Sequence, residues 1–272
     1  MIHSTAVVFP FDTFGNAGTS AGAQLLGDVL QEALEDTADE PRQTRPHSYA
    51  ESLDIEDVSF ETMEQLAAWR TTGRALVRPM LGDGEFVLWL AGNHLGVLPV
   101  YEELGADTLV IQFDAHLDCY DLHDTTPTLS HGNFLLHAET PLPRIVNLGH
   151  RDLFLLPTEI KPTFTEAYSA ELVATDFSSV LEAVRKHAKK AKRIWVDLDV
   201  DAIDPAYAPA VHQPMPFGLT PMHLLAVIAA VWSPKVVGVS ISEYDPGRDV
   251  RDTTLNLLGW LLEHILLKRH EP

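Results

Sequence analysis

The sequence has very little cysteine and no long uninterrupted hydrophobic run. Its 272 residues include a single cysteine, Cys119, so an intramolecular disulfide is excluded and a reducing compartment, the cytoplasm, is expected. The first residues lack a basic stretch followed by a long apolar one, and we therefore expect no secretory signal. The longest apolar segments, near residues 224–232 and 255–267, are too short or too interrupted to span a bilayer.

Basic residues are also scarce. Lysine and arginine total 19 against 39 aspartates and glutamates, which gives a formal net charge of −20. So acidic a surface repels nucleic acid and anionic membranes and favours cationic ligands or metal ions, although solubility alone also explains it. The basic run at residues 186–193 lies at the expected end of a helix, where cations complement the helix dipole. We expect neither nucleic acid nor a membrane among the partners.

Short β-branched runs alternate with helical patterns along the chain. This order is typical of an α/β protein with a parallel sheet and helices on both faces, and the length predicts a single domain over residues 1–272. The predicted strands are residues 6–10, 86–91, 108–114, 144–148, 193–198 and 236–242. The predicted helices are residues 21–35, 62–76, 94–104, 177–191, 221–231 and 252–268. We expect a loop at residues 36–47 and core positions for Trp195, Trp232 and Trp260.

Acids and histidines gather at the ends of two predicted strands. The two sets are Asp114, His116 and Asp118, and Asp197, Asp199 and Asp201. Alternate side chains of an extended segment project to the same side, and ligands of open α/β sheets bind outside the carboxyl ends of the strands. We therefore expect each set to converge on one point.

Such a concentration of carboxylates requires compensating positive charge. A buried, unpaired carboxylate is strongly penalised and would protonate, whereas divalent cations would neutralise it. Mixed carboxylate and imidazole ligands suit Mn²⁺, with Zn²⁺, Fe²⁺, Co²⁺ and Ni²⁺ as competitors. Any one of these residues alone is more often a turn, cap or surface residue. Together they indicate a centre for two metal ions, a common arrangement in hydrolases.

These residues and their neighbours resemble the ureohydrolase family, which includes arginase, agmatinase, guanidinobutyrase and formimidoylglutamase. That family carries a G-G-D-H-S turn, a D-A-H-x-D motif, a later H-G, an S-x-D-x-D-x-x-D-P motif and a late glutamate after a strand. The matching segments are AGNHL at 91–95, FDAHLD at 113–118, SHGN at 130–133, DLDVDAIDP at 197–205 and ISEYDP at 241–246. The resemblance spans nearly the whole chain and implies an arginase-like three-layer α/β/α sandwich with a mainly parallel central sheet.

The resemblance also implies a ligand set for two Mn²⁺ ions. One ion would be held by His94, Asp114, Asp118 and Asp199. The other would be held by His116, Asp114, Asp199 and Asp201, so that Asp114 and Asp199 bridge the two. A hydroxide bridging the ions would attack the carbon of a guanidinium or amidinium group.

His131 occupies the position of the family's proton shuttle, and Glu243 that of the carboxylate which grips the cationic head of the substrate. With Asp114, these are the residues that we expect to act in catalysis. The implied reaction is hydrolysis of the C–N bond of a small cationic guanidino compound, releasing urea and an amine as agmatinase does. The family also implies a homo-oligomer, a trimer or a hexamer.

Three departures from the family pattern stand out in the sequence. Asn93 stands where an aspartate is usual, which removes a carboxylate that could orient His94. The segment CYDLHD at 119–124 is not the Asn-rich loop of arginases, which weakens the case for arginine. His212 replaces a usually small residue, and we expect it on a loop. Carboxylates near Cys119 oppose a thiolate, so this residue is expected to be passive. Arg151 points either into the pocket or to a neighbouring subunit.

Several alternatives remain open from the sequence. One is an amidine hydrolase of the formiminoglutamate type, which would release formamide, and another is arginase proper. A metal-binding relative without catalysis is opposed by the retention of His131 and Glu243. A deacetylase of the related fold is opposed by the paired-metal ligand set.

Overall fold

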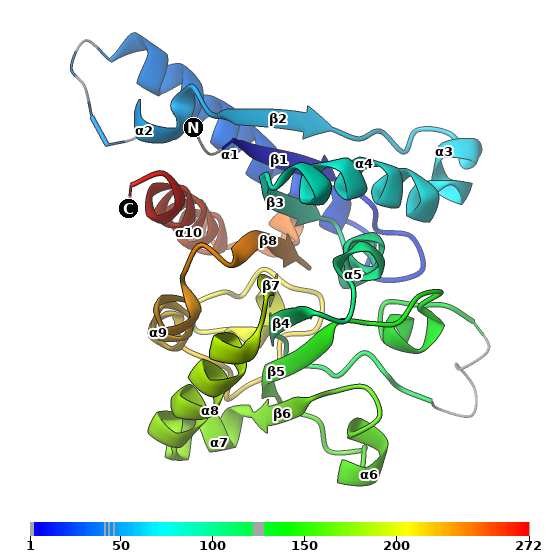
Figure 1. The fold of residues 1–272 in the computed structure, drawn as a ribbon. Helices are drawn as coiled ribbons and strands as arrows, with labels where there is room; N and C mark the ends of the chain where they lie inside the picture. The colour runs from blue at the N-terminus through cyan, green and yellow to red at the C-terminus, as the bar shows by residue number, and fades with distance from the viewer. Residues whose placement is uncertain (1–2, 41, 43, 46, 122–127, 272) are drawn as a thin grey trace.

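The computed structural model describes residues 3–40, 42, 44–45, 47–121 and 128–271. Its strands form one parallel sheet in the order β2-β1-β3-β8-β7-β4-β5-β6 (Figure 1). The strands are β1 (Ser4–Phe9), β2 (Leu53–Asp57), β3 (Phe86–Ala91), β4 (Thr108–Phe113), β5 (Arg144–His150), β6 (Glu166–Ser169), β7 (Arg193–Asp199) and β8 (Val236–Ser242). The last strand, β8, therefore lies in the middle of the sheet, between β3 and β7.

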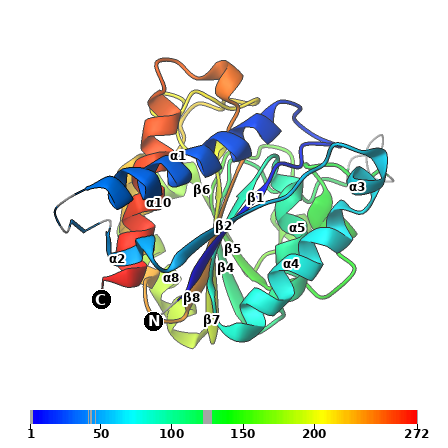
Figure 2. The same ribbon diagram turned by 90° about the horizontal axis from the view of Figure 1, so that it is seen from above.

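Helices cover both faces of the sheet, which gives the expected three-layer arrangement (Figure 2). One face carries α1 (Thr19–Asp39), α2 (His47–Ala50), α7 (Ala170–Thr175), α8 (Phe177–Lys190), α9 (Pro221–Val231) and α10 (Thr253–His270). The other carries α3 (Met63–Ala67), α4 (Trp69–Asp83), α5 (Leu98–Leu104) and α6 (Pro157–Ile160). Short 3-10 turns are η1 (His94–Val97), η2 (Phe134–His137), η3 (Val200–Ala202) and η4 (Pro246–Arg248).

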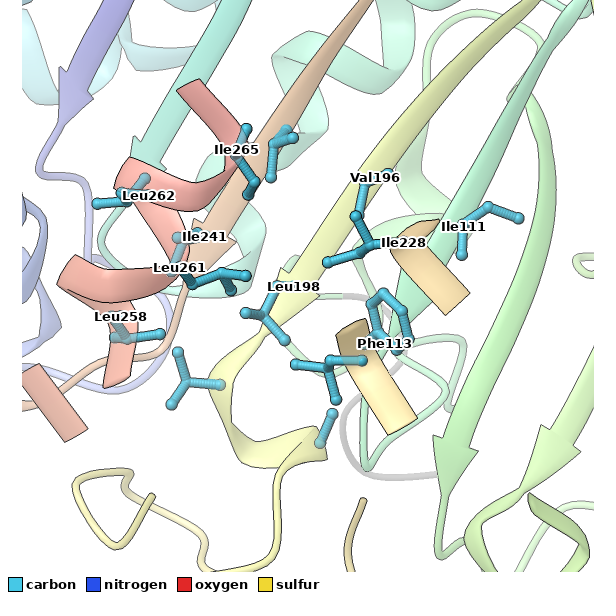
Figure 3. Close-up of a cluster of buried hydrophobic side chains, with 14 of the residues drawn as sticks. Ile111, Phe113, Val196, Leu198, Ile228, Ile241, Leu258, Leu261, Leu262 and Ile265 are labelled. Atoms are coloured by element: carbon cyan, nitrogen blue, oxygen red, sulfur yellow. The ribbon is translucent and has the colours of Figure 1, made fainter. Parts of the chain in front are cut away.

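The core consists of two hydrophobic layers, one on each face of the sheet. Within β1, Val8 belongs to the layer beneath α1 and α10, whereas Val7 belongs to the layer beneath α4 and α5. Both are fully buried, because strands that are covered on both faces have no solvent side. Figure 3 shows the first layer, in which Leu261 of α10 lies near Leu198 and Ile241 of the central strands. This packing fixes the carboxyl ends of β3, β8, β7 and β4 beside one another.

The predicted strands and helices are all present, with small shifts at their ends except for the helix predicted to end at residue 76, where α4 continues to Asp83. The predicted helix at 94–104 begins as the η1 turn, and the one at 62–76 is divided into α3 and α4. The prediction of a loop at 36–47 is partly wrong, because α1 continues to Asp39 and α2 begins at His47. Trp195 is buried and Trp232 half-buried, but the prediction for Trp260 is wrong, since 52% of it is exposed on α10.

The sequence patterns missed two strands, β2 and β6. Both lie at the edges of the sheet, where one side of each strand is open. Their sequences, LDIED and EAYS, are accordingly more polar, and most of their residues are exposed or half-buried. In the described part of the chain, no helix is both long and apolar enough to cross a membrane.

Candidate metal centre

The residues predicted to bind metal meet, together with the predicted substrate carboxylate Glu243, at the carboxyl ends of four adjacent strands. His94 follows β3, Glu243 follows β8, Asp199 ends β7 and Asp114 follows β4. These strands are neighbours in the order β3-β8-β7-β4, and all run parallel. Segments that are distant in sequence therefore deliver their side chains to one point.

The first group of candidate ligands is His94, Asp114 and Asp118, whose ligand atoms all lie within 4.8 Å of one another. His94 Nδ1 is 2.9 Å from Asp118 Oδ2 and 3.3 Å from Asp114 Oδ2. Asp199 Oδ2 also lies 3.3 Å from this nitrogen. The four residues that the resemblance assigns to one metal are thus gathered around His94 Nδ1.

The second group is Asp114, His116 and Asp201, again with ligand atoms within 4.8 Å. His116 Nδ1 lies 2.9 Å from Asp201 Oδ2 and 3.9 Å from Asp114 Oδ1. Asp114 belongs to both groups, as a bridging carboxylate would. Asp199 connects with the second group through its Oδ1, which accepts a hydrogen bond from the Asp201 backbone N–H at 2.9 Å.

The hydrogen bonding of His94 suits a cation at its Nδ1. On the other side of the ring, Nε2 lies 2.8 Å from Asp197 Oδ2. A carboxylate can only accept, so Nε2 donates to Asp197, and Nδ1 is the nitrogen that faces the oxygens of Asp114 and Asp118, where its lone pair would be available to a cation. His94 Nδ1 and Asp114 Oδ2 are both buried without a hydrogen-bond partner. Acceptors that converge in this way fit a bound divalent cation, and the N/O donor set fits Mn²⁺ among others.

Without cations, the cluster carries strong electrostatic strain. Burial, reinforced by the neighbouring Asp118 carboxylate, raises the pKa of Asp114 to about 7. Burial and the adjacent Asp201 and Asp114 carboxylates raise the pKa of Asp199 well above its usual range. Burial opposes the charged form of His116, but Asp201 outweighs it and raises the pKa of this imidazole to about 10. A centre that neutralises these carboxylates removes the strain.

Two residues at the site hold left-handed backbone conformations. Asp118 has φ 44° and Glu243 has φ 67°, values that are costly for residues other than glycine. Glu243 is buried, and its Oε1 accepts from the His94 backbone N–H at 2.9 Å while Oε2 accepts from Asn16 Nδ2 at 2.8 Å. Burial raises the pKa of Glu243. The strained turn thus places the carboxylate directly beside His94, a candidate metal ligand.

A cavity of about 150 Å³ opens over these groups. Its described lining consists of Asn16, His116, Asp118, Tyr120, His131, Gly132, Asp199, Asp201, Gln213 and Glu243. His131 and Glu243 thus face the same space as the candidate ligands, which is the arrangement that the sequence predicts. His131 Nδ1 is buried and has no hydrogen-bond partner.

Asn16, Tyr120 and Gln213 are lining residues that the sequence patterns did not indicate. They stand on loops outside the motifs, in positions where neither periodicity nor ligand chemistry gives a signal. Asp197 was grouped with the candidate ligands, but its carboxylate lies behind His94 and contacts the ring nitrogen that faces away from the cluster.

The structure places Cys119 in the core layer beneath α4 and α5. Burial, together with the Asp118 carboxylate, raises its pKa to about 12, so the thiol is un-ionised at neutral pH. This agrees with the passive role predicted for it.

Arg151 does not line the cavity over the candidate ligands. Its guanidinium donates to four backbone carbonyls, those of Gly149, Asp201, Ala202 and Met215, at 2.7–3.1 Å. It therefore ties the end of β5 to the η3 turn that carries Asp201, and brings a positive charge close to the acidic cluster.

His212 lies on a loop, as predicted, and is not among the described residues that line the cavity. Its Nε2 is 2.8 Å from the Ala17 carbonyl oxygen and 3.3 Å from Asp245 Oδ2.

Comparisons with known proteins agree with this architecture. An agmatinase of Bacillus anthracis is 29% identical over 204 residues, which are 68% of this chain and 67% of the relative. A guanidinobutyrase of Pseudomonas aeruginosa is 27% identical over 217 residues, 76% of this chain and 67% of the relative. The crystal structure of the agmatine ureohydrolase of Thermoplasma volcanium has a TM-score of 0.78 at 22% identity, covering 98% of this chain and 90% of that one.

Fold, motifs and relatives together define the class of the protein, a hydrolase of the ureohydrolase type. The model of the arginase family matches residues 4–268, and the chain belongs to that family.

Proposed function

We propose that the protein hydrolyses the C–N bond of a guanidino compound of the agmatine type, releasing urea and an amine, with two divalent metal ions, Mn²⁺ in the first place. The observation that carries this proposal is the pair of His/carboxylate groups that share Asp114 beside a cavity lined by Glu243 and His131. When bound, the two cations would supply the Lewis acidity that makes a water nucleophilic near neutral pH.

The protein's own groups would divide the remaining work. His94, Asp118 and Asp199 would hold one cation with Asp114, and His116 and Asp201 the other. Glu243 would accept N–H bonds from the guanidinium and so fix the plane of the reacting carbon. The oxygen of water adds to that carbon, and the bond to the amine nitrogen breaks. His131 would transfer a proton to the departing amine, which then leaves as a neutral or cationic product.

The charge of the cavity supports a substrate without a carboxylate tail. The described residues that line it include no lysine or arginine. They do include four acids, Asp118, Asp199, Asp201 and Glu243. The metals would neutralise Asp118, Asp199 and Asp201, but a tail carboxylate, as in arginine or formiminoglutamate, would still find no lysine or arginine to pair with among the described lining residues. Agmatine or free guanidine needs no such partner, and this favours the agmatinase type over arginase and over the amidine alternative.

The test is release of urea by the protein loaded with Mn²⁺. The panel is agmatine, guanidinobutyrate, guanidinopropionate, arginine and free guanidine, and release of formamide from formiminoglutamate is measured in parallel. We expect urea from agmatine or guanidine and little from the carboxylates. Formamide release without urea would replace the proposal with the amidine hydrolase, and silence across the panel with two metals bound would overturn it.

Two further features belong to the same proposal. Mn²⁺ should support the highest turnover when the metal-free protein is reloaded with Mn²⁺, Zn²⁺, Co²⁺ or Ni²⁺ in turn. The protein should be a trimer or a hexamer of identical chains, measured as molar mass by light scattering during gel filtration.

A further inference from the structure

Two of the three departures from the family pattern contact the same loop. This loop, residues 12–18, connects β1 to α1 and carries Asn16 at the cavity. Asn93 Nδ2 donates to the Thr13 carbonyl oxygen at 3.1 Å, and His212 Nε2 donates to the Ala17 carbonyl oxygen at 2.8 Å. An aspartate at position 93 could not donate, because a carboxylate only accepts. The two departures therefore fasten the loop on both sides of Asn16.

The loop is also seated directly against His131. The His131 backbone N–H donates to the Phe14 carbonyl oxygen at 3.1 Å. A Cβ atom at Gly15 would lie 2.5 Å from Asn93 Nδ2 and 2.9 Å from the His131 ring, so glycine is required at this close approach. At the far end of the loop, Asp12 Oδ2 accepts from the Gly18 backbone N–H at 2.8 Å. The position of Asn16 is thus set by contacts along the whole loop.

Asn16 in turn contacts Glu243. Its Nδ2 donates to Glu243 Oε2 at 2.8 Å, while the other carboxylate oxygen is held by the His94 backbone N–H. The amide nitrogen must face the carboxylate, because the carboxylate can only accept. The amide oxygen of Asn16 is then an acceptor in addition to the Glu243 carboxylate. Asn16 and Glu243, which come from different loops, both line the cavity, and each carries an acceptor: the neutral amide oxygen of Asn16 and the charged carboxylate of Glu243.

We propose that Asn16 is a substrate-binding residue that determines specificity: it holds Glu243 in position and accepts an N–H of the substrate through its amide oxygen. This inference rests on the function proposed above. A guanidinium or amidinium head carries N–H donors in one plane, and each needs an acceptor when the head leaves water. A neutral acceptor beside the carboxylate pairs with a second N–H without adding charge. The site therefore selects heads whose terminal nitrogens are unsubstituted.

Asn93 and His212 are positioning residues in this scheme, because they act on the substrate through the loop. Retention of the donor at either position should preserve substrate binding. His212→Gln keeps an N–H donor near the Ala17 carbonyl, whereas His212→Ala removes it. Asn93→Asp restores the residue usual in the family but turns a carboxylate toward the Thr13 carbonyl.

The experiment compares Asn16→Ala with Asn256→Ala, an exposed asparagine on α10, in the Mn²⁺-loaded protein. Loss of one hydrogen bond to a charged group corresponds to roughly a 10–100-fold loss of binding. We expect Asn16→Ala to raise KM by roughly that factor, with a smaller effect on kcat and an unchanged metal content. Asn256→Ala should leave both parameters as they are. An unchanged KM in Asn16→Ala, with Glu243→Gln raising it, would overturn the inference.

The positioning residues add a second, graded measurement. His212→Ala and Asn93→Asp should both raise KM, and His212→Gln should keep it near that of the unaltered protein. If His212→Ala and His212→Gln behave alike at unaltered KM, the loop does not need this hydrogen bond and the positioning role is rejected.

Binding of guanidinium alone separates this inference from the proposed function. Calorimetric titration of the metal-loaded protein with guanidinium chloride needs no turnover. Should no substrate be hydrolysed, the proposed function fails, yet weaker guanidinium binding by Asn16→Ala would still support the role of Asn16. Equal binding by the two proteins would overturn it.

Discussion

The carboxylate that orients His94 is not at the position next to it in the sequence. The loss of an aspartate at position 93 suggested a less well-oriented His94, but Asp197 of β7 supplies a carboxylate at 2.8 Å from Nε2. The motif of the ureohydrolases has serine at this position of the DLDVDAIDP segment. Asp197 also accepts from the Tyr101 hydroxyl at 2.6 Å and from the Ser240 hydroxyl. A buried carboxylate with three donors is well placed to fix the ring and to strengthen Nδ1 as a metal ligand.

The Asp197→Asn variant should therefore bind metal more weakly. Replacement of the charge behind a ligating histidine typically lowers metal affinity by roughly 10–100-fold. The loss should fall on the site that contains His94, leaving one metal per chain after dialysis, as measured by elemental analysis. Tyr101→Phe keeps the carboxylate and removes one donor, so it should retain more metal than Asp197→Asn. Two tightly bound metals in Asp197→Asn would contradict this role.

His131 should matter for turnover but not for metal binding. Its ring lines the cavity, and it belongs to neither group of candidate ligands. His131→Ala removes the proton donor and should lower kcat by roughly 10²–10⁴ while both metals stay bound. Metal content and kcat are measured on the same preparation. If metal is lost along with activity, His131 is a ligand and the proton-transfer role is wrong.

At the scale of residues, the sequence predicted those site residues whose side chains are typical metal ligands. Five of the six candidate ligands were found because acids and histidines at alternate positions after strands have a recognisable pattern, whereas His94 came only from the family resemblance of the AGNHL segment. The structure brings the six together. Asn16 was missed because an asparagine in a Gly-containing loop looks like turn chemistry. The role of Asp197 could not be separated from that of Asp199, since both point to the same side of one strand.

At the scale of elements, ion pairs join α4 to α5, the helix that follows the His94 turn. Arg70 and Arg74 of α4 contact Glu102 of α5, and Arg78 contacts Glu103. Arg70 also donates to the His137 carbonyl oxygen at 2.8 Å, and the Glu102 side chain is fully buried. Burial opposes the charge of Glu102, but Arg70 outweighs it and keeps the pKa of this carboxyl below its usual range.

Arg70→Met should destabilise the protein much more than Arg78→Met. The first change leaves the buried carboxylate with only the more distant Arg74, at 3.8 Å, of its two described arginine partners, and removal of one partner from a buried pair typically costs about 3–5 kcal/mol of unfolding free energy. Arg78 is exposed, so loss of its pair should cost less than about 1 kcal/mol. Denaturant unfolding of both variants measures the difference. Because the pKa of Glu102 is lower in the folded protein, its contribution to the free energy of unfolding is fully present above the pKa that it has in the unfolded chain. This contribution is lost as the pH falls through the pKa of the folded state. The two variants should therefore converge in acid, and equal losses at neutral pH would contradict the buried pair.

The elements that the sequence did not reveal share a physical cause. Strands in the middle of the sheet are buried on both faces and read as apolar runs, as in FVLWLA of β3. The edge strands β2 and β6 have one open side and no such run, and their pairing is decided by neighbours that are distant in sequence. Helix ends are also poorly marked in the sequence: α1 continues to Asp39, beyond its apolar pattern, and Thr37 in this last part is buried.

At the scale of the whole molecule, the acidic cluster links stability to pH and to metal. The pKa of Asp114 is raised to about 7 in the folded, metal-free protein, so between about pH 4 and 7 the folded state binds more protons than the unfolded one. The stability of the metal-free protein should therefore fall as pH rises through this range. His116, with its pKa raised to about 10, acts in the same direction above its unfolded value. Metal binding has the opposite dependence, because the ligands must be deprotonated.

The melting temperature should therefore respond to Mn²⁺ more strongly at pH 8 than at pH 5.5. The measurement is the difference in melting temperature between metal-loaded and metal-free protein at each pH, which cancels the effect of the large net charge. Asp114→Asn should flatten the dependence on pH as well as weaken metal binding. A difference that is constant or shrinks with rising pH would show that these carboxylates are not the groups that bind the metal.

The position of β8 in the sheet has a consequence for the order in which the protein can be made. Strands β1 to β3 form one side of the sheet and β4 to β7 the other, and β8 joins them. His94 belongs to the first side, whereas Asp114, Asp199 and Asp201 belong to the second. During translation both sides leave the ribosome before residues 236–242 do, so the imidazole and its carboxylate partners have no fixed relation until the final strand inserts. Of the two groups of candidate ligands, the one that contains His94 would therefore be assembled only when β8 inserts, whereas Asp114, His116 and Asp201 already lie together on one side of the sheet.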